Sequence, residues 1–457
     1  MGLSNACKAG FHHDKGGPAA KKNRRSLTMP DTVDIAVHHV TRVEGHSNIV
    51  VNTKNGELEE CRLEIIEGPR FFESMMRGRS WNEAQTISCR ICGICSVAHS
   101  CTSLRATEDA MGVEISKQTL LLRKLILYGE QLQSHWLHVF FLALPDFLGA
   151  PSVLPLAASH PEVVKMALRM KKLGNYIGEV VGGRHVHPMA LAVGGMHAVP
   201  TEKRLRELKQ IMVDMRPDLE ATVGLFAGIE WPDFERETEY ISIRDPKEYA
   251  FYAGDLVTSD GVSASPRDYL EAITEKVVAH STAKHASCSR DEYLVGALAR
   301  YNNNYDQLLP IAKESAETMG LPHPSHNPYH MNLAQVVEGV HCHERCIEII
   351  DELLEAGVRF EPVEVKVKAG RGVGMCEAPR GLLIHDYTYD ENGMITDCNC
   401  VIPTAQNYAN IEADMRGLVP KVLDRSQEDI TMLLEELVRA YDPCISCSAH
   451  LLNVEFI

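Results

Sequence analysis

Two short cysteine motifs stand at opposite ends of this chain, and together they constrain its fold more than any other feature. The first is 90–95 (RICGIC) and the second is 442–447 (DPCISC). Four thiols in two C-x-x-C pairs are enough to close one metal site. A site built from both ends ties the whole fold to the metal, because neither half completes the site alone.

The spacing of the cysteines does not by itself choose the metal. Each pair alone is compatible with a zinc half-site, a redox disulfide or half of an iron–sulfur site. Zinc sites usually join pairs a dozen or two residues apart, whereas about 350 residues separate these two pairs. A thioredoxin-like motif needs only one pair. The residues beside the motifs are therefore needed to identify the kind of metal site.

The composition limits the class of protein. The net charge of −16 disfavours a nucleic-acid partner, which needs a basic surface. Fourteen cysteines without a recognisable signal peptide are typical of a reducing compartment, so we expect a cytoplasmic location. No apolar run reaches the roughly 18 residues that span a membrane. Residues 1–30, rich in Gly, Lys and Arg, are expected to form a disordered tail.

Hydrophobic periodicity predicts a mixed protein. Alternating patterns with Asn-Gly turns predict strands in 33–67, 363–367, 381–389 and 394–402. Helical spacing predicts helices over 120–137, 161–181, 202–226, 291–319, 334–356 and 427–441. We find no internal repeat or long linker, so 31–450 is expected to be one intertwined domain. The predicted fold class is α+β, mainly helical, with a central bundle of long helices flanked by small β-sheets. The two terminal motifs are expected to meet at a buried metal site.

Further motifs accompany the cysteines. His99 follows the first pair and His450 the second, and 41–46 (TRVEGH), 377–381 (EAPRG) and 401–404 (VIPT) lie between or before them. This set resembles the signatures of nickel–iron hydrogenase large subunits over about residues 33–450, and is most like the cytoplasmic, multi-subunit enzymes. The resemblance implies the hydrogenase large-subunit fold and reversible heterolytic cleavage of dihydrogen to protons and electrons.

The resemblance also assigns the thiols. Cys92 and Cys444 would be terminal nickel ligands, and Cys95 and Cys447 would bridge nickel to an iron that carries carbon monoxide and cyanide. Soft thiolates suit both metals. Cys444 would take the proton first and Glu44 second. Read alone, Glu44 is a carboxylate paired with Arg42 or His46.

Other residues would surround the centre. By the resemblance, the Arg380 guanidinium lies over the open metal position and donates to one cyanide, and it stays protonated. Thr404 would donate to the other cyanide, although it also reads as a plain strand residue. His99, one helical turn after Cys95, would tune the bridging sulfur, against the alternative of core packing. Asp442 would be a pocket carboxylate, or else part of a helix-ending Asp-Pro turn.

A second metal, magnesium or iron, is implied near the C-terminus. Its ligands would be Glu73, His450 and a backbone carbonyl near Cys400. Residues 451–457 are either a peptide removed on maturation or a retained end. The stretch 341–346 (HCHERC) looks like a metal cluster, but we expect buried helix residues there. Cys89, Cys376 and Cys398 are likewise expected to be buried thiols.

The chain shows no ferredoxin spacing of its own, so an iron–sulfur small subunit is expected to carry the electrons. Further electron-transfer subunits of the nicotinamide/flavin diaphorase or heterodisulfide reductase type would follow. The segment 182–195 resembles a family loop that faces the electron-transfer partner. The run 370–374 (GRGVG) lacks the order of a dinucleotide fingerprint. Two alternative classes are a structural zinc or iron–sulfur protein, and the quinone-site subunit of respiratory complex I, which shares this fold without the metal.

Overall fold

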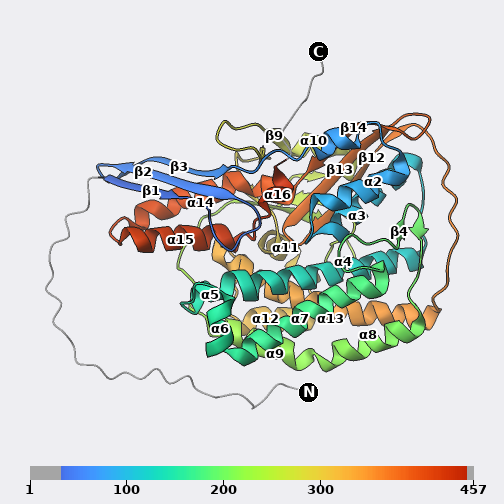
Figure 1. Cartoon of the computed structure of the whole chain (residues 1–457), viewed down its shortest axis with the longest axis horizontal. Coiled ribbons are helices and arrows are strands. Elements are labelled where there is room, and N and C mark those ends of the chain that lie inside the picture. Colours follow the sequence, from blue (N-terminus) through green and yellow to red (C-terminus); the bar gives the residue numbers. More distant parts are fainter. Residues whose placement is uncertain (1–31, 450–457) are drawn as a thin grey trace.

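A layer of long helices forms one side of the molecule, and several small sheets lie on the other (Figure 1). The computed structural model describes residues 32–449, so the predictions for 1–30, His450 and 451–457 fall outside the described residues. Helix α4 (Lys117–Leu137) packs against both α7 (Pro161–Gly182) and α13 (Met331–Ala356). The predicted α+β fold with a central bundle of long helices is confirmed.

Shorter helices complete the helical layer and cover the sheets. They are α1 (Phe72–Met76), α2 (Trp81–Ser88), α3 (Ser96–Met111), α5 (Leu144–Phe147), α6 (Val153–Ser159), α8 (Glu202–Asp214), α9 (Arg216–Ala227), α10 (Tyr269–Ala272), α11 (Ala297–Asn304), α12 (Pro310–Thr318), α14 (Pro403–Val422), α15 (Gln427–Ala440) and α16 (Ile445–Ser448). Within residues 32–449, no helix is both long and apolar enough to cross a membrane.

The sheets are small and mostly antiparallel. Strands β1 (Thr32–Val37), β2 (Ser47–Lys54) and β3 (Glu57–Ile65) form one sheet, with the predicted hairpin turn at Asn55-Gly56. Strands β12 (Gly370–Ala378), β13 (Gly381–Tyr389) and β14 (Ile395–Val401) form a second. The remaining strands are β4 (Leu191–Ala192), β5 (Gly195–Met196), β6 (Glu239–Arg244), β7 (Asp255–Thr258), β8 (Ser263–Ala264), β9 (Thr274–Lys276), β10 (His285–Ser287) and β11 (Tyr293–Leu294). Strand β11 pairs with β6 in parallel.

The glycine-rich run at 370–374 serves helix packing. A Cβ atom at Gly374 would lie 1.9 Å from the carbonyl oxygen of Thr102, and one at Gly372 would lie 2.1 Å from that of Ala106. Both carbonyls belong to α3, so the missing side chains let this helix lie directly on β12. Since α3 begins at the first cysteine pair, this close packing fixes the position of the motif.

Three element predictions are wrong, each for a local reason. The expected helix 202–226 is two helices, because α8 ends at Asp214 and Pro217 stands in the first turn of α9. The expected helix 291–319 contains β11, α11 and α12, broken where Gly296 has a φ of 116° and where Pro310 starts α12. The segment 363–367 forms no strand; Val363 instead packs over the glycines 194–195.

Candidate metal centre

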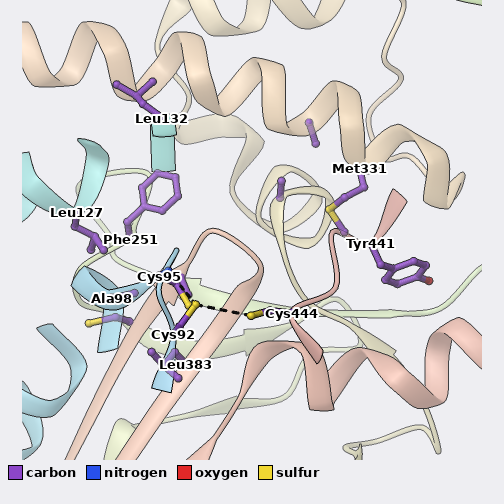
Figure 2. Close-up of a cluster of buried hydrophobic side chains, with 14 of the residues drawn as sticks. Cys92, Cys95, Ala98, Leu127, Leu132, Phe251, Met331, Leu383, Tyr441 and Cys444 are labelled. Carbon is purple, nitrogen blue, oxygen red and sulfur yellow. Dashed lines mark hydrogen bonds between the residues drawn. The ribbon is translucent and has the colours of Figure 1, made fainter. Parts of the chain in front are cut away.

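The two cysteine pairs meet inside the protein, as the sequence predicts. Cys92 and Cys95 lead into α3, and Cys444 and Cys447 flank the start of the short α16. All four side chains are 5% exposed or less. Figure 2 shows Cys92 and Cys95 facing Cys444 across the site.

The sulfur atoms form one cluster. Cys92 Sγ lies 3.7 Å from Cys444 Sγ, and the sulfurs of Cys444 and Cys447 are in direct contact. The sulfurs of Cys92, Cys95 and Cys447 lie within 4.8 Å of one another. The sulfurs of Cys444 and Cys447 are joined as a disulfide, and four cysteine sulfurs from both chain ends therefore converge on a single point, as one metal centre requires.

The electrostatic environment shifts the pKa values of Cys92 and Cys95 in opposite directions. Burial opposes ionisation of Cys92, but hydrogen bonds from the Cys95 thiol and backbone, together with the positive charge of Arg380, lower its pKa. The pKa of Cys95 is raised well above its usual value, mainly because its thiol donates to Cys92. The site thus favours ionisation of Cys92 over that of Cys95, and the thiolate is the form that binds soft metals.

The Glu44 carboxylate contacts the cysteine site and forms no ion pair with Arg42 or His46 among the contacts of the described residues. Its Oε2 lies 3.3 Å from Cys444 Sγ and accepts a hydrogen bond of 3.0 Å from the backbone N–H of Ser446. Arg42 instead pairs with Asp146, and His46 with Glu67. The backbone of Glu44 also forms a parallel bridge with Cys444.

Arg380 and Asp442 form a buried pair beside the sulfurs. The Arg380 Nη2 donates to Asp442 Oδ1 at 2.8 Å, and Nε donates to the Asp442 carbonyl oxygen at 2.5 Å. Although burial works against the cation, Asp442 and the thiols raise the pKa of Arg380, so the guanidinium stays charged. Its Nη1 is buried and has no hydrogen-bond partner among residues 32–449.

Thr404 and His99 also lie near the cysteine motifs. Thr404, in the first turn of α14, accepts the backbone N–H of Cys444 at 3.0 Å through Oγ1. His99 is buried on α3, and its Nδ1 lies 3.0 Å from His385 Nε2. The expected influence of His99 on Cys95 stays a prediction.

The carboxylate of Glu73 contacts the backbone of Cys400, and the second-metal hypothesis stays a prediction. The backbone N–H of Cys400 donates to Glu73 Oε1 at 2.9 Å, although the two residues are 327 positions apart. Burial raises the pKa of Glu73, and Lys284 Nζ lies 4.0 Å from the same oxygen. The third expected ligand, His450, falls outside the described part of the chain.

Two residues that sequence reasoning missed hold the cysteine motifs in place. The Arg70 guanidinium donates to the carbonyl oxygens of Ile91 and Ser446, at 2.7 and 3.3 Å, and so joins both motifs. The buried Glu130 accepts the backbone N–H groups of residues 97 and 98, at 2.6 and 2.7 Å, in the first turn of α3. No local spacing could reveal either contact.

The expected non-ligand cysteines behave as buried thiols. Cys342 and Cys346 are completely buried on α13, and Cys89, Cys376 and Cys398 are 4% exposed or less. Within residues 32–449, the stretch 341–346 contributes to no cluster of three ligand atoms within 4.8 Å.

Buried thiols from both chain ends, with a carboxylate and a guanidinium beside them, define a thiolate-ligated metalloenzyme of α+β fold. The family described as nickel-dependent hydrogenase matches residues 70–172 and 233–450. The chain belongs to this family. It is a large, catalytic hydrogenase subunit, an oxidoreductase acting on dihydrogen at a nickel–iron centre. The match sets aside the zinc-protein and quinone-site alternatives.

Individual relatives are similar to this chain over nearly its whole length. The alpha subunit of sulfhydrogenase 1 from Pyrococcus furiosus is 35% identical over 432 residues, covering 94% of this chain and 100% of the relative. The alpha subunit of sulfhydrogenase 2 from the same organism is 34% identical over 421 residues, covering 92% and 100%. The structure of an NAD+-reducing [NiFe]-hydrogenase in the H2-reduced state is 28% identical, covers 92% and 100%, and has a TM-score of 0.82.

Proposed function

We propose that Cys92, Cys95, Cys444 and Cys447 would hold the nickel–iron centre through their sulfur atoms. The convergence of four buried sulfurs from opposite chain ends carries this proposal. Thiolates are soft donors that suit both metals. When bound, the centre supplies the Lewis-acid and redox chemistry that dihydrogen cleavage needs.

The surroundings fit a centre with carbon monoxide and cyanide on iron. The Nη1 atom of Arg380 is a buried donor without a partner among the described residues, and a cyanide nitrogen would accept its hydrogen bond. Asp442 fixes the rest of the guanidinium, so Nη1 is held in one direction. Because Thr404 Oγ1 accepts an N–H from Cys444, its hydroxyl hydrogen stays available and would donate to the second cyanide.

The proton leaves the centre through Cys444 and Glu44. The Cys444 sulfur takes the proton as a base beside the metal, and Glu44 Oε2, 3.3 Å away, receives it next. The Ser446 N–H holds the carboxylate in this position. Glu44 is only partly buried, so it connects the dry sulfur cluster with the region towards solvent.

Glu73, the backbone carbonyl of Cys400 and His450 form the proposed second site, for magnesium or iron. Its support is the 2.9 Å contact between Glu73 and the Cys400 backbone. Oxygen donors from a carboxylate and a carbonyl suit a hard cation such as magnesium. This metal would fasten the C-terminal segment to β14.

An iron–sulfur small subunit is the proposed partner, and the face next to the first cysteine motif is its proposed docking surface. A cavity of about 770 Å³ opens there, lined by Cys89, Arg90 and Met189 among others. His187 Nδ1 lies 3.1 Å from the Cys89 carbonyl oxygen, so the 182–195 loop lies directly behind the motif. Electrons would pass on to nicotinamide/flavin or heterodisulfide reductase subunits, in the cytoplasm.

The test is to measure nickel and iron in the purified complex together with the infrared bands of metal-bound carbon monoxide and cyanide. We expect both metals, both band types and hydrogen-dependent dye reduction. Cys92→Ser and Cys447→Ser should each lose nickel, while Cys342→Ser, a buried thiol outside the site, should keep it. Full nickel content in both ligand variants would refute the assignment.

A further inference from the structure

A third group of side chains that could ligate a metal lies outside the thiol cluster and the proposed Glu73 site, and the mechanism above does not use it. His280 and His285 belong to the β9–β10 hairpin, and Glu412 lies on α14. One ring nitrogen of each histidine and one oxygen of Glu412 lie within 4.8 Å of one another. We call these three residues the His280–His285–Glu412 cluster.

The hydrogen bonds within the cluster leave one ring nitrogen of His285 without a partner among residues 32–449. His280 Nε2 lies 2.7 Å from Glu412 Oε1. His285 is only 8% exposed, and its buried Nε2 atom has no hydrogen-bond partner among residues 32–449. Leaving a buried polar atom without a partner is energetically unfavourable, so a simple ion pair between His280 and Glu412 does not account for His285.

Two neighbouring groups donate hydrogen bonds to the Glu412 carboxylate and fix its orientation, as hydrogen bonds do for carboxylates that bind metal ions. The Leu63 N–H donates to Glu412 Oε1 at 3.0 Å, and Arg416 donates to Oε2 at 2.9 Å. The two histidine rings stand almost perpendicular, at 83°, with centroids 5.6 Å apart, so they are not stacked on each other.

We propose that His280, His285 and Glu412 bind a divalent transition-metal ion of the zinc class. Two imidazoles and one carboxylate are a known zinc donor set, with a water in the fourth position. Donor atoms on tetrahedral zinc are about 3.3 Å apart, since each lies about 2.0 Å from the metal. The donor atoms of the cluster, within 4.8 Å of one another, would have to move closer together to bind the ion. The His280 side chain is 27% exposed, which gives the ion a path from solvent.

The ion would clamp a hairpin to the helix that carries Thr404. The loop between β9 and β10 already rests on the end of β3, because Thr282 donates to the carbonyl oxygens of Ile65 and Glu67. Glu412 lies two turns along α14 from Thr404. A metal bound by the cluster would fix the hairpin against both β3 and α14.

The experiment measures zinc and nickel in the same samples of the complex, purified without a histidine tag. We expect about one zinc per large subunit. After chelation, the protein should bind one equivalent of Co²⁺ with the visible absorption of a low-symmetry nitrogen–oxygen site. Loss of an outer-sphere contact costs 10–100-fold in affinity, so loss of a ligand in His285→Gln should weaken Co²⁺ binding at least about 100-fold.

Two further variants make the outcome decisive. His280→Gln changes a partly exposed loop residue, so it tests the site even where His285→Gln disturbs folding. His330→Gln is the matched control, since His330 is a partly buried histidine that pairs with Ser325 outside the cluster. Nickel content should be unchanged in all of them, which separates this result from the nickel–iron proposal. Absence of zinc together with no Co²⁺ uptake, or unchanged uptake in His280→Gln and His285→Gln, would overturn the site.

Discussion

Replacing Glu44 by glutamine removes the proposed proton acceptor while keeping its shape. The glutamine Oε1 atom can still accept the N–H of Ser446, so the loop and the cysteine motif should stay in place. The amide cannot take a proton from the Cys444 sulfur, 3.3 Å from the original carboxylate. A positioned general base contributes about 10²–10⁴ in rate, which corresponds to about 3–5 kcal/mol. We therefore expect hydrogen-dependent dye reduction to fall at least about 100-fold.

The assay has to separate proton transfer from loss of the metals. Nickel content and the infrared bands should match the unmodified complex, whereas exchange of deuterium gas with solvent protons should fall along with dye reduction. Glu67→Gln is the matched control, because Glu67 is a nearby carboxylate that pairs with His46 and not with a sulfur. Retention of more than about one tenth of the rate by Glu44→Gln, at full nickel content, would refute the proton route.

Three further predictions concern the scaffold. Arg300 is fully buried against two buried carboxylates, so Arg300→Met should lose about 3–5 kcal/mol in urea denaturation, whereas Arg244→Met, at an exposed pair, should lose about 1 kcal/mol or less. Gly374→Ala should destabilise by about 1–3 kcal/mol or more, because its Cβ would meet α3, while Gly224→Ala, with open space, should be neutral or stabilising. Burial raises the pKa of Glu377 from 4.5 to about 7, so the folded protein holds a proton that the unfolded chain releases. Stability should then fall by about 3 kcal/mol between pH 4.5 and 7, and Glu377→Gln should flatten this part of the denaturation profile.

Local sequence patterns predicted the elements whose signal is local. The 3.6-residue periodicity of α4 and α7 and the Asn-Gly turn between β2 and β3 depend on neighbouring residues alone, and these elements were found. The stretch 291–319 has a helix-like composition, but Gly296 and Pro310 divide it. Its short strand β11 depends on pairing with β6, far away in the sequence, which no window could reveal.

The residues of the site also fall into those with a local sequence signal and those without one. The cysteines, Glu44 and Arg380 carry recognisable motifs, so the residues that come together could be named from the sequence. Arg70 could not, because it reaches one motif 21 residues away and the other 376 residues away through backbone carbonyls, which any residue type presents. The same holds for the His280–His285–Glu412 cluster, whose members share no common motif.

The contact between Glu44 and Cys444 depends on the backbone more than on either side chain. The bridge between these two residues pairs the N-terminal loop with the C-terminal motif, and the Ile445 N–H donates to the Glu44 carbonyl oxygen at 2.9 Å. Gly45 makes this approach possible: its φ is 87°, and an added Cβ would lie 2.7 Å from the Cβ of Ile445. A bulkier residue would separate the two segments and lengthen the path from sulfur to carboxylate. The glycine of the 41–46 motif therefore sets the distance between the Cys444 sulfur and the Glu44 carboxylate, over which the proposed proton transfer would take place.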